Sequence, residues 1–380
     1  MAIINVTGFE SGVVGEALST TGTVSFGTGV PHTGTYNLLA NPTTTAVGWT
    51  NWGSPSESFG GLQQAFDKAD IWANFYFRIA TLPAADSEPI CQVITGAAAL
   101  KLEIRVDSAG NLSAYDAAVG LLATGATVLS TDTYYSIGIR CGTSATVGAY
   151  EVTINGVSEF SGTGNTSATN AAGVGLGKTT NRNGRTVAFQ YDDLIISDSG
   201  YNEGAVVSKI GVPTANGSTM SWTSGTGASD YTQVDEVPPN VADYVMSPTT
   251  GNPNLALFAM QDCATIDTNI ATGTILGVMF YTMVREDTTV TSSVNIRILS
   301  GSTSSEATTP RNSTTTASFN RRFLALNPDT STAWTTTTID AVETGAIENN
   351  AVAQRGVEVY MMVVYIPGGD EATVWYAALV

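Results

Sequence analysis

The sequence predicts an all-β chain that folds as two β-sandwich domains in tandem. Short segments alternate apolar and polar residues with a period of two, which is typical of strands with one buried face. Residues that favour turns separate these segments, and no long segment has the 3.6-residue period of a helix. With 380 residues, of which 43% are hydrophobic and 13% charged, the chain is long and apolar enough to form two cores.

The first 200 residues contain the clearest strand patterns. In the segment 100–106, Leu102 and Ile104 are expected to face the core, whereas Lys101, Glu103 and Arg105 are expected to face water. The dipeptide 155–156 is Asn-Gly between two alternating runs, and this pair favours a type I′ hairpin turn. Further strands are expected at 74–79, 112–115, 135–141, 150–154 and 157–160.

The segment 186–199 is interpreted as the closing strand of a first domain, residues 1–200. Phe189 and Tyr191 lie on one face, but after the pair Asp192 and Asp193 the apolar phase moves by one residue, to Leu194. A side-chain period of two cannot absorb such a shift without a bulge or kink. We therefore expect the acidic pair to lie at a bend in the strand.

The second domain is expected to cover residues 205–380. Trp222 and Trp334 are interpreted as residues of its core or of the domain junction. The segment 332–345 has apolar residues at helical spacing and predicts one short helix. Strands are expected at 206–212, 255–260, 275–284, 294–299 and 357–366.

Two resemblances to known proteins follow from these patterns. The succession NFYFRI, LKLEIRVDSAGNLSAY, TYYSIGIRC, YEVTINGVSEF and VGLGKTTNRNGRTVAFQYDDLIISD resembles a concanavalin A-like (LamG-type) jelly roll, a family whose last strand often reads aromatic-Asp-Asp-apolar. Residues 205–380 resemble a β-sandwich domain of tailed-phage structural proteins, in the spacing of Trp222, YTQVDE, DYV and Trp334. The first family includes lectins, glucanases and phage proteins, so this fold alone implies no single function.

The charge and the motifs of the chain argue against several classes of partner. The formal net charge is −18, and residues 1–200 contain sixteen acidic and eight basic side chains. Without a basic patch, direct binding to nucleic acid is not expected, because phosphate neutralisation supplies most of that affinity. The sequence contains no segment of membrane-spanning length, no signal-peptide pattern at its start and no cofactor fingerprint. We therefore expect no membrane partner and no cofactor.

Trp49 and Trp52 are the candidate ligand-binding residues. They lie among Gly, Asn and Pro, which predicts a polar loop. Loop aromatics can stack on a sugar ring, since they offer flat apolar area with a polar rim. The alternative is that they fill the end of the sandwich or a subunit contact.

No catalytic arrangement is predicted. Glu103, Glu151 and Glu159 are interpreted as solvated strand positions rather than as the carboxylate pair of a glycosidase. His32 is the only histidine and is expected in an exposed loop without a catalytic partner.

The acidic pair of the closing strand is the one candidate metal site. Asp192 and Asp193 offer the carboxylate oxygens that Ca²⁺ prefers. Adjacent residues of a regular strand point to opposite faces, so a bulge is needed to bring both to one ion. The alternative is a purely structural bend.

These observations lead to two hypotheses. The first, implied by the resemblances, is a non-enzymatic structural protein of a tailed-phage particle, either a head decoration protein or a tail or fibre protein. It implies a place on the virion surface after synthesis in the bacterial cytoplasm, contacts with other virion proteins and a homo-oligomer. The second is a carbohydrate-binding adhesin whose first domain attaches to host or environmental glycans.

Overall fold

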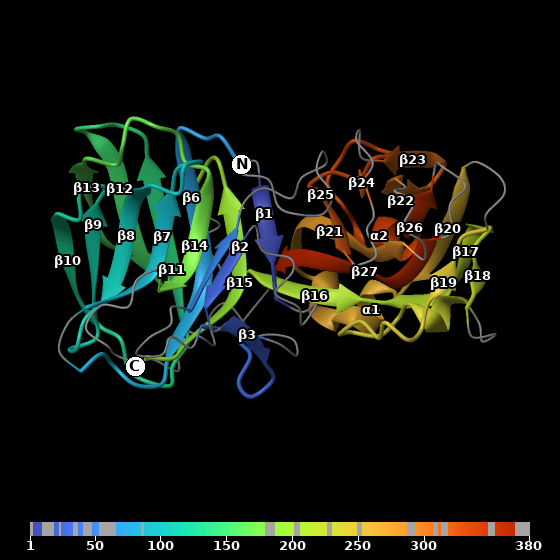
Figure 1. Ribbon diagram of the computed structural model, residues 1–380, viewed down its shortest axis with the longest axis horizontal. Helices are drawn as coiled ribbons and strands as arrows, with labels where there is room; N and C mark the ends of the chain where they lie inside the picture. The colour runs from blue at the N-terminus through green and yellow to red at the C-terminus, as the bar shows by residue number, and fades with distance from the viewer. Residues whose placement is uncertain are drawn as a thin grey trace. The chain divides into compact units, whose positions relative to one another are not determined.

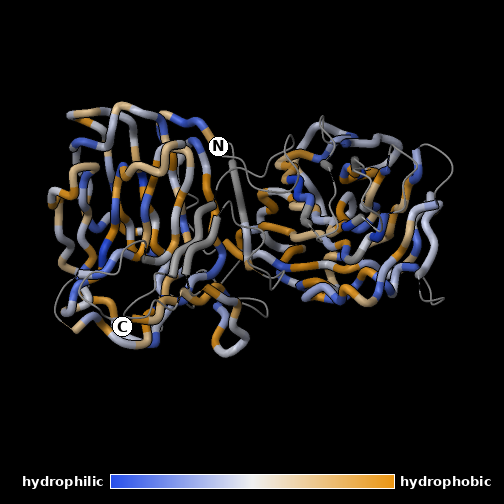
Figure 2. Tube along the Cα trace, viewed as in Figure 1, coloured by the Kyte–Doolittle hydropathy of each residue, from blue (hydrophilic) through white to orange (hydrophobic). Residues whose placement is uncertain are grey.

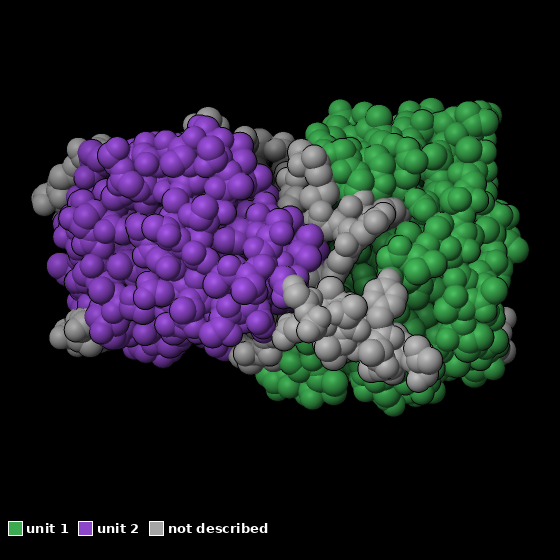
Figure 3. Space-filling view, turned by 180° about the vertical axis from the view of Figure 1, so that it is seen from behind, with its two compact units in different colours: residues 1–54, 63–204 green, residues 55–62, 205–380 purple. Residues whose placement is uncertain are grey.

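The computed structural model confirms the all-β class (Figure 1). It describes residues 3–9, 19–22, 24–32, 37–40, 48–52, 66–84, 87–178, 187–200, 206–225, 230–248, 253–286, 293–306, 311–312, 318–348 and 354–368. The chain divides into two compact units, one of residues 1–54 and 63–204 and one of residues 55–62 and 205–380 (Figure 3). None of the described helices is long and apolar enough to span a membrane.

The first unit is a sandwich of two antiparallel sheets. The eight-stranded sheet has the order β13 (Val157–Gly164), β12 (Gly148–Ile154), β11 (Tyr135–Gly142), β6 (Asp70–Ile79), β15 (Phe189–Ser197), β4 (Asn37–Ala40) and β3 (Val24–Gly27), with β1 (Ile3–Thr7) also paired to β15. The seven-stranded sheet has the order β10 (Leu121–Val128), β9 (Asn111–Asp116), β8 (Leu100–Val106), β7 (Glu88–Ile94), β14 (Gly173–Lys178), β5 (Gly48–Trp52) and β2 (Ser19–Gly22).

One hydrophobic core fills the space between these two sheets. Hydrophobic and hydrophilic residues alternate along many of the strands (Figure 2), and the apolar positions of both sheets belong to a single buried cluster. The Tyr191 hydroxyl donates a hydrogen bond of 2.7 Å to the Ile90 carbonyl and so ties β15 of one sheet to β7 of the other. Asn155 and Gly156 both have positive φ, as the predicted type I′ turn requires.

The second unit also contains two antiparallel sheets. One has the order β18 (Thr223–Ser224), β19 (Val245–Met246), β27 (Gln354–Ile366), β21 (Thr274–Glu286) and β25 (Ser318–Leu324), with β16 (Val207–Gly211) also paired to β27. The other has the order β17 (Pro213–Met220), β20 (Asn254–Met260), β26 (Glu343–Glu348), β22 (Ser293–Ser300) and β23 (Thr303–Glu306), with β24 (Arg311–Asn312) also paired to β22. Trp222 and Trp334 are buried in its core.

Short helices complete the second unit. The predicted helix is α2 (Thr336–Asp340), which begins after a capping box in which the side chains of Thr335 and Thr338 bond reciprocally to backbone N–H groups. Ile339 is the buried residue of this helix. The remaining helical segments described are α1 (Cys263–Ile266), η2 (Asp230–Gln233) and η3 (Thr268–Ala271).

Candidate functional site

The backbone of Trp49 and Trp52 lies in strand β5, whereas the sequence predicts a loop. Position 49 pairs with Gly177 and position 52 with Val174 of β14, so both are held in the seven-stranded sheet. Turn-forming neighbours misled the sequence argument, because Gly and Asn also occur in strands when the adjacent strand supplies the hydrogen bonds. The two tryptophan side chains lie outside the described residues, so their proposed contact with sugars stays a prediction.

The predicted bulge at the acidic pair is confirmed. Asp192 pairs with Tyr76 of β6, but the next paired residue on β15 is Ile195, opposite Asn74. Two residues of β15 therefore face one residue of β6, and Asp193 has a φ of +46°. Both carboxylates of the pair are buried.

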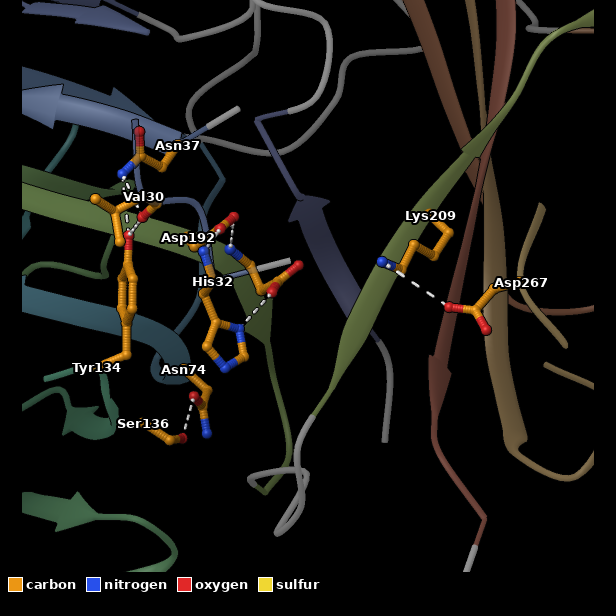
Figure 4. Close-up of polar contacts among 10 residues, drawn as sticks. Val30, His32, Asn37, Asn74, Tyr134, Ser136, Asp192, Lys209 and Asp267 are labelled. Carbon is orange, nitrogen blue, oxygen red and sulfur yellow. Dashed lines mark hydrogen bonds and ion pairs between the residues drawn. The ribbon is translucent and has the colours of Figure 1, made fainter. Parts of the chain in front are cut away.

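The bulge holds His32, which is not in an exposed loop as predicted. The His32 backbone N–H donates 2.7 Å to Oδ2 of Asp192, and the imidazole Nδ1 lies 3.2 Å from Oδ2 of Asp193 (Figure 4). The imidazole is 4% exposed and stacks on the Tyr76 ring with the centroids 3.5 Å apart. The partner of His32 is 161 residues away in sequence, so no local pattern predicted it.

Tyr134 and Asn37 hold the same segment from the other side. The Tyr134 hydroxyl donates 2.7 Å to the Val30 carbonyl, and Nδ2 of Asn37 donates to that carbonyl and to the Tyr134 hydroxyl (Figure 4). Burial, together with the Asp193 and Asp192 charges, raises the pKa of Tyr76, and burial raises the pKa of Tyr134. Both phenols are therefore protonated at neutral pH, and the stacking of Tyr76 on His32 together with the hydrogen bond from Tyr134 to Val30 fixes the chain around residues 30–32 to the bulge.

The acidic pair and its neighbours do not form a recognisable metal centre. The carboxylate oxygens of Asp192 accept from the backbone N–H groups of His32 and Asp193. Among the described residues, no group of three His, Cys, Asp or Glu side chains is placed to hold a metal ion. Calcium at Asp192 and Asp193 therefore stays a prediction, now set against a described structural role.

The charged residues of β8 contradict the prediction that they face water. Lys101, Glu103 and Arg105 are at most 5% exposed. Nζ of Lys101 donates 2.6 Å to the Thr166 carbonyl and 2.5 Å to the Thr169 carbonyl, so the loop before β14 covers it, and burial lowers its pKa. Alternation correctly gave the face on which these side chains lie, but it carries no information on what covers that face.

Glu103 and Arg105 belong to a group that we call the sheet-face cluster: Gln92, Glu103, Arg105 and Tyr115. Gln92 of β7 pairs with Glu103 of β8, and Glu103 pairs with Tyr115 of β9, so these three positions form one line across the sheet. Their strand neighbours Val93, Leu102, Ile104 and Ala114 belong to the core, which places the cluster on the face away from the core.

Direct contacts join the members of the cluster. The Glu103 carboxylate accepts hydrogen bonds from the Gln92 amide and from Nε of Arg105. The Arg105 guanidinium lies over the Tyr115 ring, 3.6 Å from its centroid. Nη2 of Arg105 is buried and has no hydrogen-bond partner in the described part of the chain. A buried donor without an acceptor is costly, and such groups often mark a site completed by a ligand.

The strand beside the cluster has a glycine in line with it. Gly175 of β14 pairs with Gln92 on one side and with Asn51 of β5 on the other, so the line of the cluster continues over a residue without a side chain. Position 49 pairs with Gly177 on the same strand. Glycines within strands often mark places where a ligand or another backbone approaches closely.

The other two carboxylates that were expected to be solvated have structural partners. Glu159 of β13 accepts 2.8 Å from the Thr127 N–H and also contacts the Thr127 hydroxyl and the Ala126 N–H. It thereby links β13 to β10 across the two sheets. Glu151 is half-buried and lies opposite Arg140 in the β11–β12 pair. Neither carboxylate belongs to the sheet-face cluster. The sequence analysis did not predict that cluster.

Comparisons with known proteins give only remote structural likenesses. No family model and no curated protein matches the sequence. Among solved structures, the cellulose-induced protein Cip1 has a TM-score of 0.39 and 16% identity, over 51% of this chain and 97% of its own. The alginate lyase AlgAT5 of polysaccharide lyase family 7 has a TM-score of 0.34 and 10% identity, over 42% of this chain and 77% of its own.

A sialidase of Trypanosoma rangeli has a TM-score of 0.33 and 12% identity, over 49% of this chain and 30% of its own. Likenesses of this size carry no argument about the activity of this chain. The described structure by itself defines an all-β protein of two sandwich units, with a buried polar cluster on the outer face of one sheet.

Proposed function

We propose that the chain is a non-enzymatic carbohydrate-binding protein that holds glycans on the outer face of the seven-stranded sheet. The observation that carries this proposal is the buried Nη2 of Arg105, which has no described acceptor and lies in a cluster with a carboxylate, an amide and an aromatic ring. Sugar hydroxyls supply acceptors to such a donor, and the flat face of a sugar ring packs on aromatic side chains.

The proposal keeps Trp49 as a candidate and adds the sheet-face cluster. Position 49 pairs with Gly177, whereas position 52 pairs with the core residue Val174. In a ladder, directly paired positions share a face, so position 49 belongs to the face of the cluster and position 52 to the core face. The two tryptophans are therefore expected to differ in function.

Binding of the intact chain to a glycan array, followed by titration with the best ligand, tests the proposal. Arg105→Lys keeps the charge beside Glu103 but removes the planar donor set, and loss of one charged hydrogen bond is expected to weaken binding about tenfold or more. Arg140→Lys is the matched control, because Arg140 also pairs with a carboxylate near an aromatic ring, on the other sheet. Equal affinity of both variants, or no glycan bound at all, would contradict the proposal.

The resemblance to tailed-phage structural proteins favours a second role, that of a virion component. None of the comparisons supports a phage origin, so this role rests on the sequence pattern alone. Antibody labelling of intact particles viewed by electron microscopy tests it. Label on the head would indicate a decoration protein and label on the tail an adhesin, whereas unlabelled particles that carry the gene would exclude the role.

A further inference from the structure

The charge of the sheet-face cluster defines the class of glycan that it would accept. Arg105 and Glu103 form an ion pair, while Gln92 contributes an amide and Tyr115 the face of its ring. The nearby cation of β8, Lys101, is engaged by the carbonyls of Thr166 and Thr169. The described residues of the cluster therefore have no net positive charge with which to attract an anion.

The hydrogen-bonding capacity of the cluster fits hydroxyl groups. Nη2 of Arg105 is a donor without a described acceptor, while the Glu103 carboxylate has more lone-pair sites than its two donors use. A hydroxyl both accepts and donates, so two adjacent hydroxyls of one sugar can accept from Arg105 and donate to Glu103. A sugar carboxylate can only accept, and it would lie next to the carboxylate that already holds Nε of the same guanidinium.

The wider charge of the first 200 residues acts in the same direction. Sixteen acidic side chains against eight basic ones repel a polyanion before it reaches the sheet, most strongly at low ionic strength. An uncharged glycan meets no such barrier.

We infer that the sheet-face cluster binds an uncharged glycan, through a pair of adjacent hydroxyls held by Arg105 and Glu103. This inference rests on the proposed function and specifies its ligand. It excludes glycans rich in uronate or sialate as the preferred partners.

Titration calorimetry of the intact chain, at low and at physiological salt, tests the inference with three probes. These are neutral gluco-oligosaccharides, oligouronates of matched length and sialyllactose. We expect measurable binding of a neutral probe, little dependence on salt, and at least tenfold weaker binding of both acidic probes. Glu103→Gln should lower the affinity for the neutral probe and raise that for the oligouronate, whereas the control Glu151→Gln on the other sheet should change neither.

The possible failures are distinguishable. Tighter binding of an acidic probe than of any neutral one by the unaltered chain would overturn this inference and leave the proposed function standing. Absence of binding to all three probes and to the glycan array would overturn the proposed function itself. An unchanged affinity in Glu103→Gln, with the fold verified by circular dichroism, would remove Glu103 from the site.

Discussion

Replacement of Arg105 by methionine tests whether the sheet-face cluster is buried as described. The side chains of Arg105 and Glu103 are 6% and 2% exposed, so the substitution leaves a buried carboxylate without its cation. Loss of one partner of a buried ion pair costs about 3–5 kcal/mol, which corresponds to a fall in Tm of roughly 6–20 °C for a unit of this size. The lost contact with the Tyr115 ring adds to the same effect.

Arg140→Met is the matched control. Arg140 pairs with Asp70 at 2.7 Å and lies 5.0 Å from the centroid of the Trp72 ring, but its side chain is 36% exposed and that of Asp70 is 32% exposed. Water screens such a pair, so its loss is expected to cost about 0–1 kcal/mol. The two variants thus compare the same chemistry at two degrees of burial.

Urea unfolding of the intact chain, followed by far-ultraviolet circular dichroism, measures the difference. Because the chain has two units, the transition that moves in Arg105→Met is the one to analyse. The double variant Glu103→Leu with Arg105→Met should recover much of the loss, since apolar pairs often replace buried ion pairs at little cost. A loss in Arg105→Met no larger than that in Arg140→Met would refute the burial of the cluster.

Three further predictions concern other parts of the first unit. Tyr191→Phe removes the bond between the two sheets and should lower the free energy of unfolding by about 1–3 kcal/mol in the same urea assay. Burial opposes the ionisation of Glu159, but the hydrogen bonds that its carboxylate accepts outweigh burial and lower its pKa. The contribution of Glu159 to the free energy of unfolding is therefore present above the ordinary pKa range of glutamate and is lost as pH falls through the folded pKa. Glu159→Gln should weaken this dependence of stability on acid pH. EDTA should leave the Tm unchanged if Asp193 serves only His32, whereas a rise in Tm with Ca²⁺ that Asp193→Asn abolishes would establish a metal site.

The sequence predicted best those features that depend on neighbours along the chain. The phase shift after Asp192 predicted a bulge, and the register with β6 is broken at that residue. The Asn-Gly turn and α2 are also set by a few adjacent residues. Periodicity did not predict strand β14, because its alternate glycines lower strand propensity; its residues entered the sequence argument only through the resemblance to the jelly roll.

The sequence failed where a polar side chain depends on residues far away. His32 looked isolated because its partners come from the closing strand of the unit. Glu103 looked solvated because alternation cannot show that a second face is also buried. One signal was available: a chain with only 13% charged residues places three charges in the seven residues of β8. Such a concentration indicates that this strand needs charged side chains for a specific reason.

Stability does not explain why charged side chains occupy these positions of β8. A buried ion pair is often no better for stability than well-packed apolar residues of similar volume, so an apolar pair at positions 103 and 105 could stabilise the sandwich as well as Glu103 and Arg105 do. The core behind them already joins both sheets. The buried donor on Arg105 that has no described acceptor lowers the stability of the cluster further. The ligand recognition proposed above would give these groups a purpose that packing does not, which is why the proposed binding site is centred on the cluster rather than on the tryptophans alone.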